Sequence, residues 1–144
     1  MAETLMDQYV IVTLDDEKFA LRIEDIHEII RMQEITEVPN CKHYIEGVIN
    51  LRGKILSVIC LRKRFGMSKI VYTKATRIVV VNYGGEVIGI IVDGVDQVKR
   101  FNDIQPPPDL ASLASGMGEA WIEGIGYLDD GLACILKMDR LLYE

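Results

Sequence analysis

The chain has 144 residues, 49% hydrophobic and 26% charged, which is the composition of a globular protein that buries its core most simply as one domain. Its 16 basic and 22 acidic residues give a net charge of -6, which argues against nucleic-acid binding and against attachment to anionic lipid. No signal peptide is visible and no run approaches the roughly 20 apolar residues that span a bilayer, so we expect no membrane insertion. The three cysteines, which are Cys41, Cys60 and Cys134, are odd in number and widely spaced, so we expect reduced thiols and a cytoplasmic protein.

Short β-rich runs separated by turn signals fill the first half of the chain. Residues 9–14 and 18–23 flank Asp15-Asp16, which predicts a β-hairpin. Acidic residues followed by isoleucines at helical spacing favour a short helical turn over 24–30, leading into a strand at 29–32. The elements expected next are a helical turn over 41–46, strands over 47–51 and 54–61 joined at Arg52-Gly53, and a short helix over 61–66 whose basic triplet Arg62-Lys63-Arg64 we expect to be solvated.

The second half repeats this order, which indicates an internal duplication. Residues 9–29 align without gaps on 78–98, with turn on turn, and residues 47–65 align on 124–142. After a flexible lead-in over 1–8, one domain over 9–144 is therefore expected to contain two subdomains, about 9–66 and about 75–142. The elements expected in the second are strands over 77–83 and 86–92 around Gly84-Gly85, a rigid loop over 105–109, a mobile stretch over 110–119, strands over 121–128 and 132–136, and a helix over 138–142.

The polar residues do not form a catalytic constellation. No nucleophile elbow or phosphate loop occurs, and His27 and His43 lack partners at the spacing of structural zinc sites, although a site built on Cys41 and His43 is an alternative. Several aspartates could pair as acid and base, but they adjoin glycines, where turn chemistry explains them. They are Asp93, Asp96, Asp129 and Asp130. We expect a non-catalytic protein with interaction surfaces, no metal and no cofactor.

One motif set resembles a known family. The run Gly47-Val48-Ile49-Asn50-Leu51-Arg52-Gly53, then residues 55–61 and 89–95, closely resembles CheW, the coupling protein of bacterial chemotaxis, over about residues 9–142. The resemblance implies an all-β fold with short helices, in which two five-stranded SH3-like β-barrel subdomains pack around a shared core. It also implies an adaptor between the regulatory domain of the histidine kinase CheA and the cytoplasmic tip of methyl-accepting chemoreceptors, recruited to arrays at the inner face of the membrane.

Other readings stay open at this stage. The same domain closes CheA and opens the adaptor CheV, but the chain has no kinase motif, phosphoacceptor segment or receiver domain, so a stand-alone adaptor is expected. The competing hypothesis is an SH3-like interaction module or scaffold unrelated to chemotaxis, such as a nucleic-acid binder, which the acidic charge disfavours, or an inactive enzyme subunit.

The resemblance implies two partner surfaces. The receptor face, in the groove between the barrels, maps to Ile26, Glu28, Gly47, Ile78, Gly89, Val95 and Val98, with Arg52 alongside. The kinase face maps to Ile35, Thr36, Val38 and Ile55, with a weaker, ring-closing contact at Leu110. Core packing is the alternative for each apolar position. Arg52 ends a strand at a tight turn, where it is either an ordinary solvated residue or, as we expect, paired with Glu28 at the groove edge.

Overall fold

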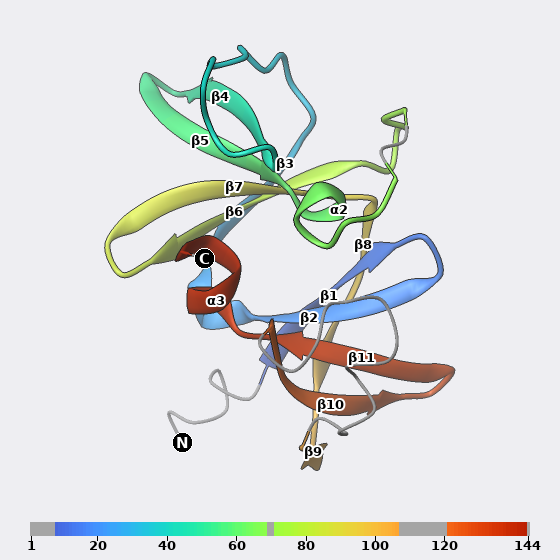
Figure 1. The fold of residues 1–144 in the computed structure, drawn as a ribbon. Helices are drawn as coiled ribbons and strands as arrows, with labels where there is room; N and C mark the ends of the chain where they lie inside the picture. Colours follow the sequence, from blue (N-terminus) through green and yellow to red (C-terminus); the bar gives the residue numbers. More distant parts are fainter. Residues whose placement is uncertain (1–7, 69–70, 107–120, 144) are drawn as a thin grey trace.

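Two β-sheets dominate the computed structural model, which describes residues 8–68, 71–106 and 121–143 (Figure 1). Within these residues, the helical elements are limited to three short pieces, η1 (Ile23–Asp25), α2 (Leu61–Arg64) and α3 (Met138–Tyr143). In spatial order the six-stranded sheet contains β8 (Gly94–Arg100), β1 (Gln8–Leu14), β2 (Glu17–Arg22), β11 (Gly131–Leu136), β10 (Ile122–Leu128) and β9 (Ile104–Gln105). The five-stranded sheet contains β3 (Ile26–Arg31), β6 (Arg77–Tyr83), β7 (Glu86–Val92), β5 (Lys54–Cys60) and β4 (Ile45–Leu51). The expected all-β fold with short helices is confirmed.

The strand register shows the internal duplication. In the parallel pair β5–β7, Ser57 lies opposite Ile88. The residues aligned with these two, Cys134 and Phe19, lie opposite each other in the parallel pair β11–β2. The antiparallel pairs β3–β6 and β1–β8 also match, including the position of the bulge in each. The repeat in the sequence is therefore a repeat in the structure.

Each sheet contains one hairpin from the opposite half of the chain. The hairpin β1–β2 lies in the sheet with β8 to β11, and the hairpin β6–β7 lies in the sheet with β3, β4 and β5. The division into subdomains over 9–66 and 75–142 stays a prediction, and the sheets do not follow it. The alignment reveals two copies of each hairpin, but it does not reveal which copy completes which sheet.

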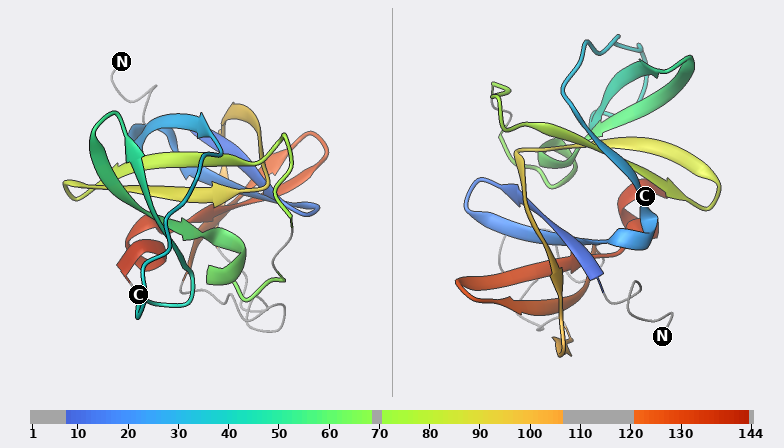
Figure 2. Two further views of the ribbon diagram at one scale, coloured as in Figure 1. Left: turned by 90° about the horizontal axis from the view of Figure 1, so that it is seen from above. Right: turned by 180° about the vertical axis from the view of Figure 1, so that it is seen from behind.

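A shared core lies between the sheets. Its largest cluster takes Phe19 and Leu21 from the six-stranded sheet and Val79 and Ile90 from the five-stranded sheet, all almost fully buried. Helix α3 adds Leu141 and lies at the seam between the layers (Figure 1). Each sheet also has a smaller cluster of its own. The ribbon passes from one layer to the other where β7 runs into β8 (Figure 2).

Two local expectations are corrected. The helical turn expected over 24–30 is limited to η1, and residues 26–31 form β3 instead. The spacing of the isoleucines suits a helix, but pairing with β6 sets Ile29 opposite Val79 and overrides that local preference. Likewise β4 begins at Ile45, inside the helical turn expected over 41–46.

Candidate partner-binding surfaces

The residues predicted for the kinase face lie at the outer end of the five-stranded sheet. Thr36 lies beside the edge strand β4. Its N–H donates to the carbonyl of Val48, and the N–H of Val48 donates to the carbonyl of Thr36, both at 2.9 Å. Ile55 on β5 is 65% exposed and Val38 is 42% exposed. Ile35 is half-buried against the cluster of this sheet. Leu110, the remaining residue of this set, lies outside the described residues.

Gly47 is placed beside these residues and is buried. A Cβ at this position would lie 2.1 Å from the carbonyl oxygen of Thr36 and 2.9 Å from Ile35, and its φ of +150° disfavours any other residue. Gly47 is predicted for the receptor face, and its neighbours Thr36 and Ile35 are predicted for the kinase face. Because Gly47 has no side chain, the segment that carries Thr36 can approach β4 closely.

The residues predicted for the receptor face divide into open and buried positions. Val98 is 54% exposed and Val95 is 37% exposed, both on the edge strand β8. Ile78 is fully buried in the cluster of the five-stranded sheet, and Gly89 packs so closely that an added Cβ would meet Ile78 at 2.8 Å. Ile26 is partly buried against the shared core. Core packing thus accounts for Ile78 and Gly89.

Ile29 is an exposed apolar residue that the sequence did not lead us to include in either predicted face. Ile29 on β3 is 39% exposed and lies at the edge of the five-stranded sheet. It aligns with Val98, which occupies the corresponding place on β8. The repeat contained this signal, because a position exposed in one copy is a candidate in the other.

The expected pair between Arg52 and Glu28 is present. Arg52 Nη2 donates to Glu28 Oε2, with the arginine side chain 67% exposed and the carboxylate 25% exposed. Arg52 has a left-handed φ of +51°, and the turn is closed by the N–H of Gly53, which donates to Asn50 Oδ1 at 2.8 Å. The pair borders a cavity of about 280 Å³ beside β3 and β5. Glu28 comes from a strand, not from the helical turn expected there.

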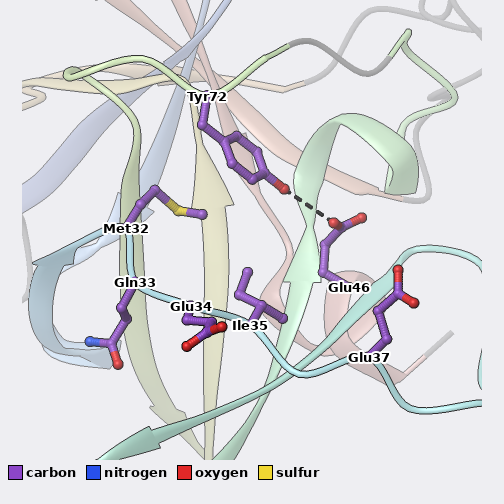
Figure 3. Close-up of a pocket in the computed structure, with 7 residues that line it drawn as sticks. All are labelled: Met32, Gln33, Glu34, Ile35, Glu37, Glu46 and Tyr72. Carbon is purple, nitrogen blue, oxygen red and sulfur yellow. Dashed lines mark hydrogen bonds between the residues drawn. The ribbon is translucent and has the colours of Figure 1, made fainter.

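A second cavity, of about 350 Å³, lies beside Ile35 (Figure 3). Tyr72 and Glu46 line it, and the tyrosine hydroxyl donates to Glu46 Oε2 at 3.1 Å. Lys63 Nζ lies 2.6 Å from the other carboxylate oxygen, Oε1. Burial, together with the negative charge of Glu46, raises the pKa of Tyr72, and the hydrogen bond to Glu46 raises the pKa of Lys63. The carboxylate of Glu46 is therefore a fixed part of the wall.

The basic helix α2 is not the solvated segment that was expected, because Arg62 is buried, with its side chain 6% exposed. Its Nε and Nη2 donate to the two carboxylate oxygens of Asp93 at 2.9 and 2.8 Å, and Nη1 donates to the carbonyl of Ser68 at 2.7 Å. Nη2 also pairs with Asp15, whose N–H donates to Asp93 at 2.7 Å. Hydrogen bonding to Asp93 raises the pKa of Arg62. The group joins the β1–β2 turn of one sheet to the end of β7 in the other, and we name Arg62, Asp93 and Asp15 the clasp.

Arg64 holds the C-terminal helix. Its guanidinium carbon lies 4.4 Å from the ring centroid of Tyr44 and 4.9 Å from that of Trp121, both within cation–π range. Nε donates to the carbonyl of Leu141 and Nη2 to that of Arg140, both at 3.0 Å. The last carbonyls of a helix need such donors, so Arg64 fixes α3 at the seam between the sheets.

The described part of the chain contains no cluster of metal-ligating side chains. No group of three or more His, Cys, Asp and Glu residues stands close enough there to hold a metal ion. Cys41 and His43 both line an open cavity, with the Cys41 thiol 3.0 Å from the carbonyl of Val38. None of the helices built from these residues is long and apolar enough to cross a membrane.

The chain is similar to a family of known proteins. The family model for the CheW-like domain matches residues 8–144. "Chemotaxis protein CheW" of Klebsiella aerogenes is 32% identical over 142 residues, covering 97% of this chain and 84% of that protein. "Chemotaxis protein CheW" of Thermotoga maritima is 32% identical over 131 residues, covering 91% and 84% respectively. The crystal structure of the scaffolding protein TtCheW from Thermoanaerobacter tengcongensis superimposes with a TM-score of 0.85 at 38% identity, covering 96% of this chain and 88% of that one.

Proposed function

Because the chain belongs to the CheW-like family of chemotaxis coupling and scaffold proteins, we propose that it is a non-catalytic adaptor between chemoreceptors and a histidine kinase. The partners are the regulatory domain of CheA and the cytoplasmic tip of methyl-accepting chemoreceptors. The adaptor works in the cytoplasm, within arrays at the inner face of the membrane. An SH3-like module unrelated to chemotaxis is not favoured, since the family match covers nearly the whole chain.

The main support for the proposed kinase contact is the exposed side chain of Ile55. It is 65% exposed on β5, next to the edge strand β4, which in turn pairs with Thr36. An apolar side chain at that exposure contributes little to folding and is available to a partner. Val38, at 42% exposure, extends the apolar surface along the same segment.

The receptor contact rests on a different edge of the molecule. Val95 and Val98 expose apolar surface on the edge strand β8. The Arg52–Glu28 pair lies by β3, which is the corresponding edge strand of the other sheet. Two separate surfaces are what an adaptor needs if it is to hold two partners at once.

The test compares Ile55→Glu with Leu132→Glu. The two positions align in the repeat, and Leu132 is 53% exposed against 65% for Ile55, so both variants should fold like the parent. Placing a charge against an apolar partner surface costs several kcal/mol, roughly, so Ile55→Glu should lose most of its affinity for the isolated kinase regulatory domain. Leu132→Glu should retain most of it. Normal kinase binding by folded Ile55→Glu would show that this assignment of the face is wrong.

A further inference from the structure

Two arginines face each other at the end of the β3–β6 pair. Arg31 on β3 lies directly opposite Arg77 on β6. Directly opposite residues of an antiparallel pair project from the same face with Cβ atoms about 5 Å apart, where like charges destabilise the sheet. The aligned pair in the other sheet is Arg100 opposite Gln8, which carries one charge. The double charge is therefore not a requirement of the repeated architecture.

A third cation is held nearby by the turn before β6. The N–H of Thr73 donates to the hydroxyl of Thr76 at 2.9 Å, and the N–H of Ala75 donates to the hydroxyl of Thr73 at 3.1 Å. Thr76 is 3% exposed, so the turn is anchored in the protein. These bonds fix the backbone of the turn on which Lys74 stands. Arg77 is fixed there too, since its Nη1 donates to the carbonyls of Lys74 at 2.6 Å and Thr76 at 2.9 Å.

The three cations border one open cavity of about 540 Å³, together with Met32 and the two threonines. Its described lining contains no carboxylate, and among the described residues no ion pair includes Arg31, Lys74 or Arg77. This is unusual on a chain of net charge -6, where acidic groups are in excess. The isolated protein thus keeps an unfavourable concentration of positive charge at this point.

We propose that this basic surface, formed by Arg31, Lys74 and Arg77, binds carboxylates of an acidic segment of a protein partner. Bound carboxylates would offset the repulsion between the facing arginines and give each cation an anionic partner. The cations stand on long side chains from three places, a strand end, a turn and a strand start, which suits carboxylates spaced along a chain. The surface shares no residue with either predicted partner face, so it is a contact beyond those of the proposed function.

Because the two arginines face each other, a binding role and a structural role predict different effects on the melting temperature. A residue that stabilises the fold lowers the melting temperature when it is removed. A residue whose charge is unfavourable until a partner arrives leaves the melting temperature unchanged or raises it, while binding is lost. Arg31→Gln and Arg77→Gln are the informative variants. Arg100→Gln is the matched control, because it removes one charge from the aligned position of the other sheet.

The experiment titrates the full-length protein with a short oligoglutamate peptide, with oligoglutamine as the neutral comparison, and follows backbone amide shifts and affinity at low salt. We expect saturable binding of oligoglutamate alone, with shifts centred on residues 73–77 and on Arg31. Arg31→Gln and Arg77→Gln should each weaken it about fivefold, as expected for one lost surface charge contact, and Arg31→Gln should do so without a lower melting temperature. Arg100→Gln should bind as the parent does.

Several results would overturn the proposal. Absence of saturable oligoglutamate binding would remove the surface, and equal loss in Arg100→Gln would reduce it to an effect of net charge. A clear drop in melting temperature for Arg31→Gln would assign the residue to the fold. Inorganic phosphate that binds at the same amides as tightly as the peptide would replace the acidic segment with a small anion.

Discussion

Removal of the Arg62 side chain should destabilise the protein far more than removal of an exposed arginine. The side chain is 6% exposed and makes two charge-assisted hydrogen bonds to Asp93, which is itself 20% exposed. Breaking a buried pair from one side costs about 3–5 kcal/mol, since the other charge stays behind. Asp93 keeps the N–H of Asp15 as a donor and some contact with water, so we expect the lower end, about 3 kcal/mol, for Arg62→Ala.

Thermal and urea unfolding measure this loss directly. At roughly 3 °C per kcal/mol for a domain of this size, Arg62→Ala should melt about 10 °C below the parent. Arg52→Ala is the matched control, because its side chain also pairs with a carboxylate but is 67% exposed, and such a pair contributes about 0–1 kcal/mol. The double variant Arg62→Met with Asp93→Leu should recover part of the loss. If Arg62→Ala had the same melting temperature as Arg52→Ala, the clasp would not contribute to stability.

The clasp also predicts a loss of stability in acid. Burial by itself would raise the pKa of Asp93, but hydrogen bonds from Arg62 and from the N–H of Asp15 hold that pKa below its ordinary value of 3.8. The unfolded chain then binds the proton more readily than the folded one. The stabilisation is present above pH 3.8 and declines as the pH falls from there through the lowered pKa. Asp93→Asn should lack this part of the decline in a pH series of urea midpoints.

Three further predictions concern single positions. Arg52→Ala should reduce receptor-dependent kinase activation in a reconstituted mixture while kinase binding and melting barely change, and full activation would remove this residue from the functional surface. Gly47→Ala should lose at least about 2 kcal/mol in urea unfolding, through left-handed strain and the clash with the neighbouring backbone, whereas Gly53→Ala, with a φ of +88° and no neighbour within 4 Å, should lose about 1 kcal/mol from strain alone. Equal losses would contradict the role of close approach. In the folded protein a maleimide should modify the exposed Cys41 quickly, while Cys60, whose pKa is raised by burial, should react only on unfolding, as mass spectrometry of the labelled peptides would show.

The hairpins and the repeat could be predicted from sequence because their signals are local. Asp15-Asp16 and Gly84-Gly85 are turn residues between β-rich runs, and both join the strands that were expected. An ungapped alignment is also a local comparison, made position by position. Which hairpin joins which sheet depends instead on contacts between segments that are distant in sequence. Two equivalent hairpins in one sequence present equivalent surfaces, so the pattern alone cannot distinguish them.

The candidate site was predictable in its exposed part and not in its ionic part. Exposure of Ile55 follows from its place in the alternating first half of β5, and it was expected to face a partner. Arg62 was expected to be solvated because it stands in a basic triplet on a short helix. Its burial depends on Asp15 and Asp93, which are distant in sequence and reach it only when two turns from different sheets meet. The charge pattern along one helix does not reveal such contacts between residues that are distant in sequence.

The clasp and the path of the chain together indicate how an adaptor of this build responds to force. Strands β7 and β8 belong to different sheets, yet Asp93 is the single residue between them, and Arg62 holds it by two hydrogen bonds. A force on the edge strand β8 therefore reaches the five-stranded sheet through Asp93, whose side chain is bonded to Arg62 on α2. We expect two sheets joined in this way, over a continuous core, to move as one body rather than as two hinged units. In the proposed function, motion of a receptor would then reach the kinase as displacement of the whole adaptor.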